Sequence, residues 1–74
     1  INYQLPQAGR VQITIYNTLG REVATLVNTE NAAGYHSVNW NGKSSNGTPV
    51  GAGVYFYRLQ TESYNAVKKM ILLK

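Results

Sequence analysis

Alternating hydrophobic and polar residues along the chain predict short β-strands. The clearest run is Val11–Tyr16, in which Val11, Ile13 and Ile15 fall on one face. No segment of ten or more residues carries the apolar stripe of an amphipathic helix. Five further segments are predicted as strands, namely residues 1–5, 22–27, 35–41, 54–60 and 65–73.

Turn-forming residues separate these segments. Two Asn-Gly pairs lie in Asn41–Pro49, the longest irregular stretch, and Val50 after it is expected to add a short edge strand. The other predicted connections are Pro6–Gly9, Asn17–Gly20 and the polar loop Asn28–Gly34. Turn signals at roughly 8–12-residue spacing favour an all-β, antiparallel sandwich or small barrel of about seven short strands.

Composition narrows the chemistry that the chain can perform. Its 74 residues allow one domain, and it has no cysteine and no aspartate. The carboxylates are Glu22, Glu30 and Glu62, which the pattern keeps in separate regions. His36 is the single histidine and shares its strand face with apolar neighbours. We therefore expect no catalytic residue, no bound metal or cofactor, and no enzymatic activity.

The formal net charge of +4 arises from few acids rather than from a dense basic patch. Aromatic residues alternate with Arg58 in the segment 54–58, which faintly resembles a single-stranded nucleic-acid platform. The same alternation places Tyr55 and Tyr57 on the face of Leu59, as in a core strand. We expect no nucleic-acid partner and no membrane insertion, since no apolar run reaches 18 residues.

Four stretches with characteristic spacing follow one another along the chain. They are Ile1-Asn2-Tyr3-Gln4-Leu5-Pro6, Val11-x-Ile13-x-Ile15-Tyr16-Asn17-x-Leu19-Gly20-Arg21-Glu22-Val23, Gly34-x-His36-x-Val38-x-Trp40-Asn41-Gly42 followed by Gly47-x-Pro49-Val50-x-x-Gly53-Val54-Tyr55-x-Tyr57-Arg58-Leu59, and Lys69-Met70-Ile71-Leu72-Leu73-Lys74. In this order they resemble a bacterial module, the C-terminal sorting domain of type IX secretion substrates, and the related Ig-like domain of flagellar hook-capping proteins. The resemblance covers essentially all 74 residues.

This resemblance implies an Ig-like β-sandwich over residues 1–74 that ends a longer secreted protein. It implies export through the periplasm and outer membrane to the cell surface or medium. The implied partners are the outer-membrane export machinery, a sortase-like peptidase, and a cargo domain upstream in the same chain. The resemblance also implies which residues the export machinery recognises. They are the positions that match the characteristic motifs of the family, namely Gly20, Arg21, Glu22, Val23, Lys68, Lys69 and Lys74.

The sequence departs from that pattern where the family commonly has aspartate. Asn17, Asn41 and Ser44 occupy those positions, and asparagine can accept the same turn hydrogen bonds as aspartate. Without a carboxylate, the loop after Trp40 is not expected to hold a metal such as calcium.

Two other functions remain open from the sequence. One is a structural Ig-like spacer or assembly module, as in hook capping. The other is a carbohydrate-binding accessory domain, for which Trp40 and Tyr64 are the candidate aromatics, although alternation places Trp40 in the core. The last strand is apolar on both faces, which fits a central position, whereas an edge position would let it pair with a receptor strand.

Overall fold

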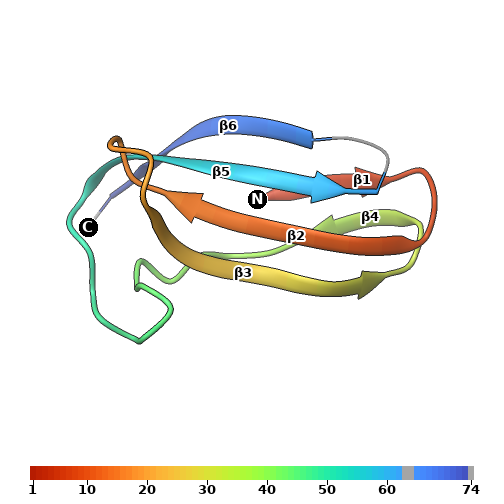
Figure 1. Cartoon of the computed structure of the whole chain (residues 1–74), viewed down its shortest axis with the longest axis horizontal. Helices are drawn as coiled ribbons and strands as arrows, with labels where there is room; N and C mark the ends of the chain where they lie inside the picture. The colour runs from red at the N-terminus through yellow and green to blue at the C-terminus, as the bar shows by residue number, and fades with distance from the viewer. Residues whose placement is uncertain (63–64, 74) are drawn as a thin grey trace.

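The computed structural model describes residues 1–62 and 65–73, which form six β-strands and no helix (Figure 1). The prediction of an all-β, antiparallel, two-layer fold is confirmed, with six strands instead of about seven. The described residues therefore include no helical segment that could cross a membrane. The strands are β1 (Asn2–Leu5), β2 (Gly9–Tyr16), β3 (Glu22–Asn31), β4 (Gly34–Ser37), β5 (Gly53–Thr61) and β6 (Asn65–Leu72).

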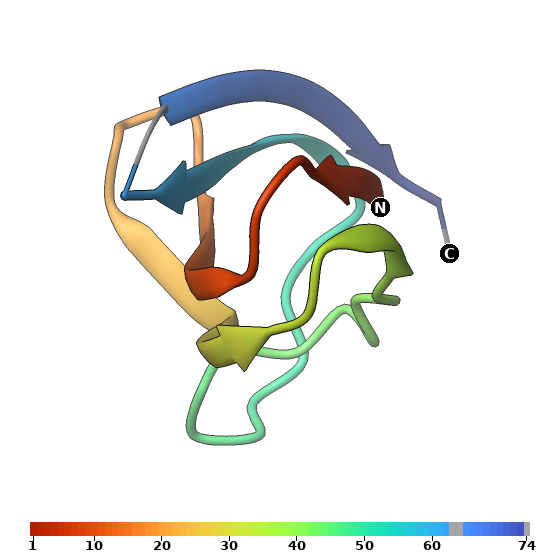
Figure 2. The same ribbon diagram turned by 90° about the vertical axis from the view of Figure 1, so that its right-hand side faces the viewer.

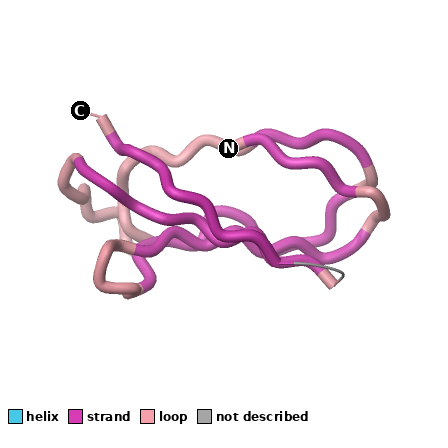
Figure 3. The backbone as a smooth tube through the Cα atoms, turned by 90° about the horizontal axis from the view of Figure 1, so that it is seen from above, coloured by secondary structure: helices cyan, strands magenta, loops and turns pink. Residues whose placement is uncertain are grey.

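Two antiparallel sheets make up the sandwich. The larger sheet has the strand order β3–β2–β5–β6, and the smaller one pairs β1 with β4. The strands run along the long axis of the molecule, and their connecting turns gather at its two ends (Figure 3). Viewed along that axis, the larger sheet curves around the smaller one (Figure 2).

Strand β2 forms the centre of the hydrophobic core. It pairs with β3 on one side and β5 on the other, so its side chains are enclosed along both edges. Val11, Ile13 and Ile15 point inward and are essentially fully buried, as their alternation predicts. From β5, Tyr55 and Leu59 are buried on the same side. Burial of these side chains supplies the main favourable free energy of folding.

The smaller sheet has only two short strands, which would be marginal alone in water. Leu5 on β1 is buried in the core with Val11, Ile13 and Leu59. Backbone hydrogen bonds between Ile1 and Val38, 2.9 Å in both directions, extend the β1–β4 pairing by one residue pair. The smaller sheet is therefore held in place by its packing against the larger one.

The loop after β4 completes the second layer. Trp40 packs edge-on against Tyr55, with ring centroids 4.9 Å apart and planes at 75°. The indole N–H of Trp40 donates a hydrogen bond to the Lys43 carbonyl (2.9 Å), and the Tyr55 hydroxyl donates one to the Gly51 carbonyl (2.7 Å). Both polar tips are satisfied at the rim, so the rings can cover the core. Trp40 faces the core as alternation predicts, but it is half-buried and packs against the cluster of Ile15, Ala24 and Tyr55 instead of lying within it.

Strand β3 contains two irregularities that increase its contribution to the core. Its register with β2 shifts between Ile13 and Thr14 and again between Ile15 and Tyr16. At the first shift, the adjacent residues Leu26 and Val27 both pack against the core, which a regular alternating strand would not allow.

Two predicted strand boundaries and one predicted strand are wrong. The loop expected at Asn28–Gly34 is instead largely strand, because β3 continues to Asn31 in a ladder with Gly9–Gln12. Strand β4 ends at Ser37 rather than Asn41, because its partner β1 begins only at Asn2. The edge strand expected at Val50 is absent, although a single bridge joins Lys43 and Pro49 nearby.

The two edges of the larger sheet differ. On β3, the Ser45 hydroxyl accepts a hydrogen bond from the Thr25 N–H (3.2 Å), and the Ser45 N–H donates one to the Val23 carbonyl (3.1 Å). The opposite edge is β6, which pairs with β5 alone. The last strand therefore lies at an edge of the larger sheet. The sequence allowed either a central or an edge position for it, and the central position is wrong.

The core assignment generates a prediction about stability. Ile13→Ala should lower the free energy of unfolding by about 2–5 kcal/mol, because it removes buried methyl groups and leaves a cavity at the centre of β2. Val67→Ala on β6 is the matched control, since that side chain is 62% exposed and its loss should cost less than about 0.5 kcal/mol. Urea unfolding followed by circular dichroism measures both, and equal losses would contradict this placement of the core.

Candidate functional site

The predicted recognition segment Gly20–Val23 begins in the hairpin turn between β2 and β3. The side-chain oxygen of Asn17 accepts hydrogen bonds from the backbone N–H groups of Leu19 (2.9 Å) and Arg21 (3.0 Å). The Gly20 N–H donates to the Asn17 carbonyl (3.0 Å), and Gly20 has a φ of +83°. Asparagine thus performs here the turn-capping role expected of aspartate. The turn has a defined shape and exposes Leu19 and Arg21 to solvent.

The next two predicted residues fall on opposite faces of β3. Glu22 is exposed and lies opposite Tyr16 of β2. Val23 is half-buried and packs against the core cluster that contains Ile15, Ala24 and Tyr55. Of this pair, Glu22 is the more accessible to a partner, while Val23 anchors the start of the strand to the core.

The two lysines of β6 also point to opposite faces. Lys69 lies opposite Phe56, on the outer face of the larger sheet. Lys68 lies opposite Tyr57, on the face that turns toward the smaller sheet. Beside Lys68 is a hollow of about 240 Å³ between β1 and β6, lined also by Tyr3 and Leu59. The third predicted lysine, Lys74, lies outside the described residues.

Strand pairing brings two of the predicted residues into one row across the larger sheet. The register aligns Glu22 with Tyr16, Tyr16 with Phe56, and Phe56 with Lys69. Residues that are directly opposite one another in a sheet share a face, so this row presents an acid and a base separated by two aromatic residues. Three interstrand spacings put the two charges about 14 Å apart.

The outer side of β6 is unusually apolar for an exposed surface. We call the residues Val54, Val67, Lys69, Ile71 and Leu73 the β6 surface. Val67, Ile71 and Leu73 are 62%, 61% and 83% exposed, and Val54 on β5 lies opposite Ile71. In the sequence, these residues belong to a predicted strand that is apolar on both faces. Alternation alone could not show which of the two faces remains exposed to solvent.

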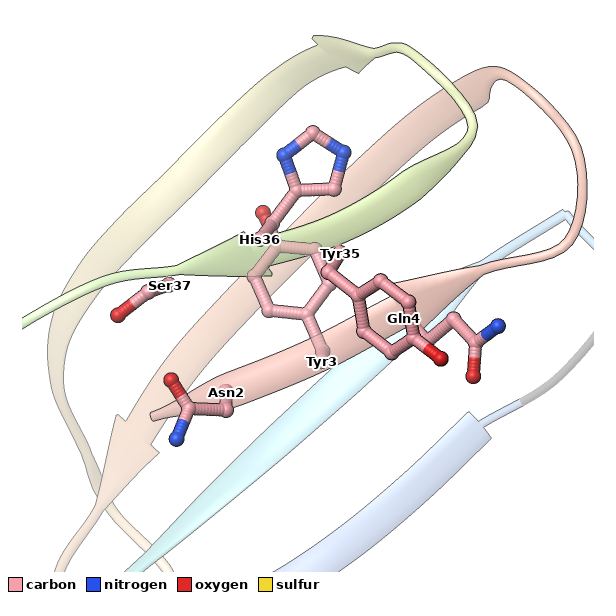
Figure 4. A pocket seen from close by; sticks show the side chains of 6 residues that line it. All are labelled: Asn2, Tyr3, Gln4, Tyr35, His36 and Ser37. Atoms are coloured by element: carbon pink, nitrogen blue, oxygen red, sulfur yellow. The ribbon is translucent and has the colours of Figure 1, made fainter.

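A second hollow, of about 460 Å³, lies on the outer side of β1 and β4 (Figure 4). It is open, and its most prominent side chain is Tyr35, which is 83% exposed. Asn2, Gln4 and Ser37 share this face with Tyr35, since the register pairs Asn2 with Ser37 and Gln4 with Tyr35. Tyr35 was not predicted as a site residue, because the prediction for its strand rested on the inward-facing side chains alone.

Tyr3 and His36 pack behind this hollow. Their rings stack with centroids 5.3 Å apart and planes 21° from parallel. The Tyr3 hydroxyl accepts a hydrogen bond from Asn31 Nδ2 (2.7 Å), and His36 Nε2 lies 2.6 Å from the Ala32 carbonyl. Burial raises the pKa of the Tyr3 hydroxyl above its usual value. The histidine is thus engaged in packing and in a backbone contact.

The side-chain oxygens of Asn41 and Asn46 in the loop after Trp40 are used within the loop itself. Asn41 Oδ1 accepts a hydrogen bond from the Lys43 N–H (3.0 Å). Asn46 Oδ1 accepts one from the Thr48 N–H (3.2 Å) and another from the Ser44 hydroxyl. Residues 1–62 and 65–73 contain no group of three or more His, Cys, Asp or Glu side chains that could hold a metal ion. The geometry is that of turns closed by their own side chains.

Comparison with known proteins identifies the family. The FlgD Ig-like domain family matches residues 1–65, and the chain belongs to this family. The match ends at the first residue of β6. The comparisons found no similar curated protein and no similar solved structure.

The Gly20 conformation generates a prediction about the hairpin turn. Gly20→Ala should lower the free energy of unfolding by about 1–2 kcal/mol, because an L-residue is strained at φ +83°. An added Cβ at Gly20 meets no atom within 4 Å, so the loss would report backbone strain and not a clash. Gly51→Ala is the control, since Gly51 also has open space but lies outside the left-handed region. Chemical denaturation compares the two, and equal stabilities would contradict the turn geometry.

The raised pKa of Tyr3 generates a prediction about alkaline stability. The folded state favours the neutral phenol of Tyr3. The resulting contribution to the free energy of unfolding is therefore complete below the unfolded-state pKa of about 10, and it is lost as the pH rises through the folded-state pKa. Tyr3→Phe should therefore flatten the decline of unfolding free energy between about pH 9 and about pH 11. Urea titrations at several pH values test this, and parallel curves for wild type and Tyr3→Phe would refute it.

Proposed function

We propose that this Ig-like domain is a non-catalytic sorting signal that directs the protein carrying it through a type IX export machinery to the cell surface or medium. The outer-membrane export components would read the folded domain, and a sortase-like peptidase would act on it after export. The domain would pass through the periplasm as the folded end of a secreted cargo protein. This role needs a stable shape and exposed recognition groups, and it needs no catalytic side chain.

One structural observation supports the proposal most directly. The hairpin turn at Gly20 and Arg21 and the edge strand that carries Lys69 belong to the same sheet, and the row from Glu22 to Lys69 joins them on one face. These are the segments that the resemblance to sorting domains selects as recognition sites. A single receptor surface could contact both without any rearrangement of the domain.

A second candidate is a structural Ig-like spacer or assembly module. Membership of the FlgD Ig-like domain family, which matches residues 1–65, favours a structural Ig-like module more directly than it favours sorting. A spacer would use the rigid sandwich to separate or align neighbouring parts of a longer chain. It would not require a free β6 surface.

The third possibility, carbohydrate binding, is weaker. Of its two candidate aromatics, Trp40 packs against Tyr55 in the core and Tyr64 lies outside the described residues. Tyr35 is exposed beside amide side chains, but the described residues of β1 and β4 place no second aromatic side chain on its outer face.

An export assay distinguishes sorting from the spacer role. Residues 1–74 are fused to the C-terminus of a reporter protein in a type IX-competent bacterium and in a strain that lacks the secretion pore. We expect the reporter at the surface or in the medium of the competent strain only. Removal of residues 69–74 should abolish export. Retention of a well-folded fusion in the periplasm of both strains would contradict the sorting role and leave the spacer.

Point variants guard against simple misfolding of the truncated domain. Arg21→Ala and Lys69→Ala change exposed side chains and should leave stability within about 0.5 kcal/mol of wild type. Each should lower export, whereas Lys43→Ala in the loop after Trp40 should not. Equal export of all three variants would show that the proposed recognition residues are not used.

A further inference from the structure

We propose that the free edge of β6 binds an extended, acidic segment of a partner protein as an additional strand of the larger sheet. The inference rests on the proposed recognition role of the domain and adds the chemistry of the partner. Strand addition of this kind gains affinity from backbone hydrogen bonds and specificity from alternate side chains.

The edge of β6 has the geometry that strand addition needs. Every residue from Asn65 to Leu72 pairs with β5 in one continuous register without a shift. Strand β3 at the opposite edge has two register shifts, and Ser45 occupies its backbone at Val23 and Thr25. Bulges and covering loops are the usual protection of sheet edges, and β6 has neither among the residues that the structure describes. Of the two edges of the larger sheet, β6 is therefore the regular one, with neither a register shift nor a loop contact among the described residues.

The two faces of β6 offer different contacts to an added strand. On the outer face, Val67 and Ile71 flank Lys69 and are mostly exposed, so apolar side chains of a partner would bury them. On the inner face, Lys68 lies beside the hollow between β1 and β6. An added strand would cover this hollow and bring its inward side chains next to Lys68.

Charge determines which strand fits. Lys68 and Lys69 occupy the middle of β6, Arg58 lies opposite Val67, and neither β5 nor β6 contains an acidic residue. A partner strand with carboxylates opposite the two lysines would form favourable cross-strand pairs on both faces. A second copy of this chain fits poorly, because an antiparallel two-fold pairing centred on β6 sets Lys68 against Lys68 or Lys69 against Lys69.

The test uses the 74-residue chain and a fluorescently labelled synthetic peptide as long as β6. The peptide alternates valine and threonine and carries two adjacent glutamates at its centre, and the control peptide has two lysines there. We expect the glutamate peptide to bind at least tenfold more tightly in fluorescence anisotropy, and this difference to shrink at high salt. Its binding should slow amide hydrogen exchange along β6 and leave exchange in β3 unchanged.

Charge-reversal variants provide the matched control. Lys69→Glu should weaken binding of the glutamate peptide about tenfold and strengthen binding of the lysine peptide. Lys43→Glu makes the same change of net charge in the loop after Trp40 and should leave both affinities unchanged. Equal effects of the two variants would overturn the inference in favour of a general charge effect. It would also be overturned by absence of glutamate-peptide binding, by exchange protection elsewhere than β6, or by a dimer that protects β6 without peptide.

The outcome is separable from that of the sorting proposal. If the peptide binds at β6 but the reporter is not exported, the docking edge stands and the sorting role fails. If the reporter is exported and Lys69→Glu leaves both peptide binding and export unchanged, the sorting role stands and the docking edge fails.

Discussion

The inward face of β2 is the contact on which both layers of the domain depend. Val11, Ile13 and Ile15 are its buried side chains, and the strands on either side of β2 enclose them. The smaller sheet is too short to be stable alone, and its position is set by what it covers on that face. A domain of this size buries a limited share of its surface, so the second layer covers the middle of the larger sheet and leaves the margin at β6 open.

Much of the fold could be predicted because side-chain alternation has the same period as a strand. The alternation in β2 and β5 identified the core residues Ile13, Ile15 and Tyr55. Strand ends were less predictable, because a backbone ladder extends as far as its partner does. Asn28–Asn31 is polar, yet it belongs to β3 because Gly9–Gln12 lies alongside it. The bulge at Leu26 also breaks alternation, so no fixed period could describe β3.

The candidate site was predictable in part. The motif around Gly20 identified a turn whose hydrogen bonds and positive φ depend on local sequence, and such local features are readable from a single segment. The exposure of Val67 and Ile71 depends instead on which strand ends the sheet, and that is decided by long-range pairing. Tyr35 escaped prediction for a related reason, since an exposed aromatic and a buried one look the same in the sequence.

The contact of Ser45 with β3 has a consequence for assembly. A sheet that grows by addition of further copies, as in a head-to-tail filament, needs two free edges on each molecule. One edge pairs with the preceding copy and the other with the next copy. Here a serine hydroxyl and its backbone N–H block one of those edges at Val23 and Thr25. If a strand docks at β6 as proposed, head-to-tail addition of a further copy through the Val23–Thr25 stretch of β3 is blocked, so docking would not start a fibre by that route.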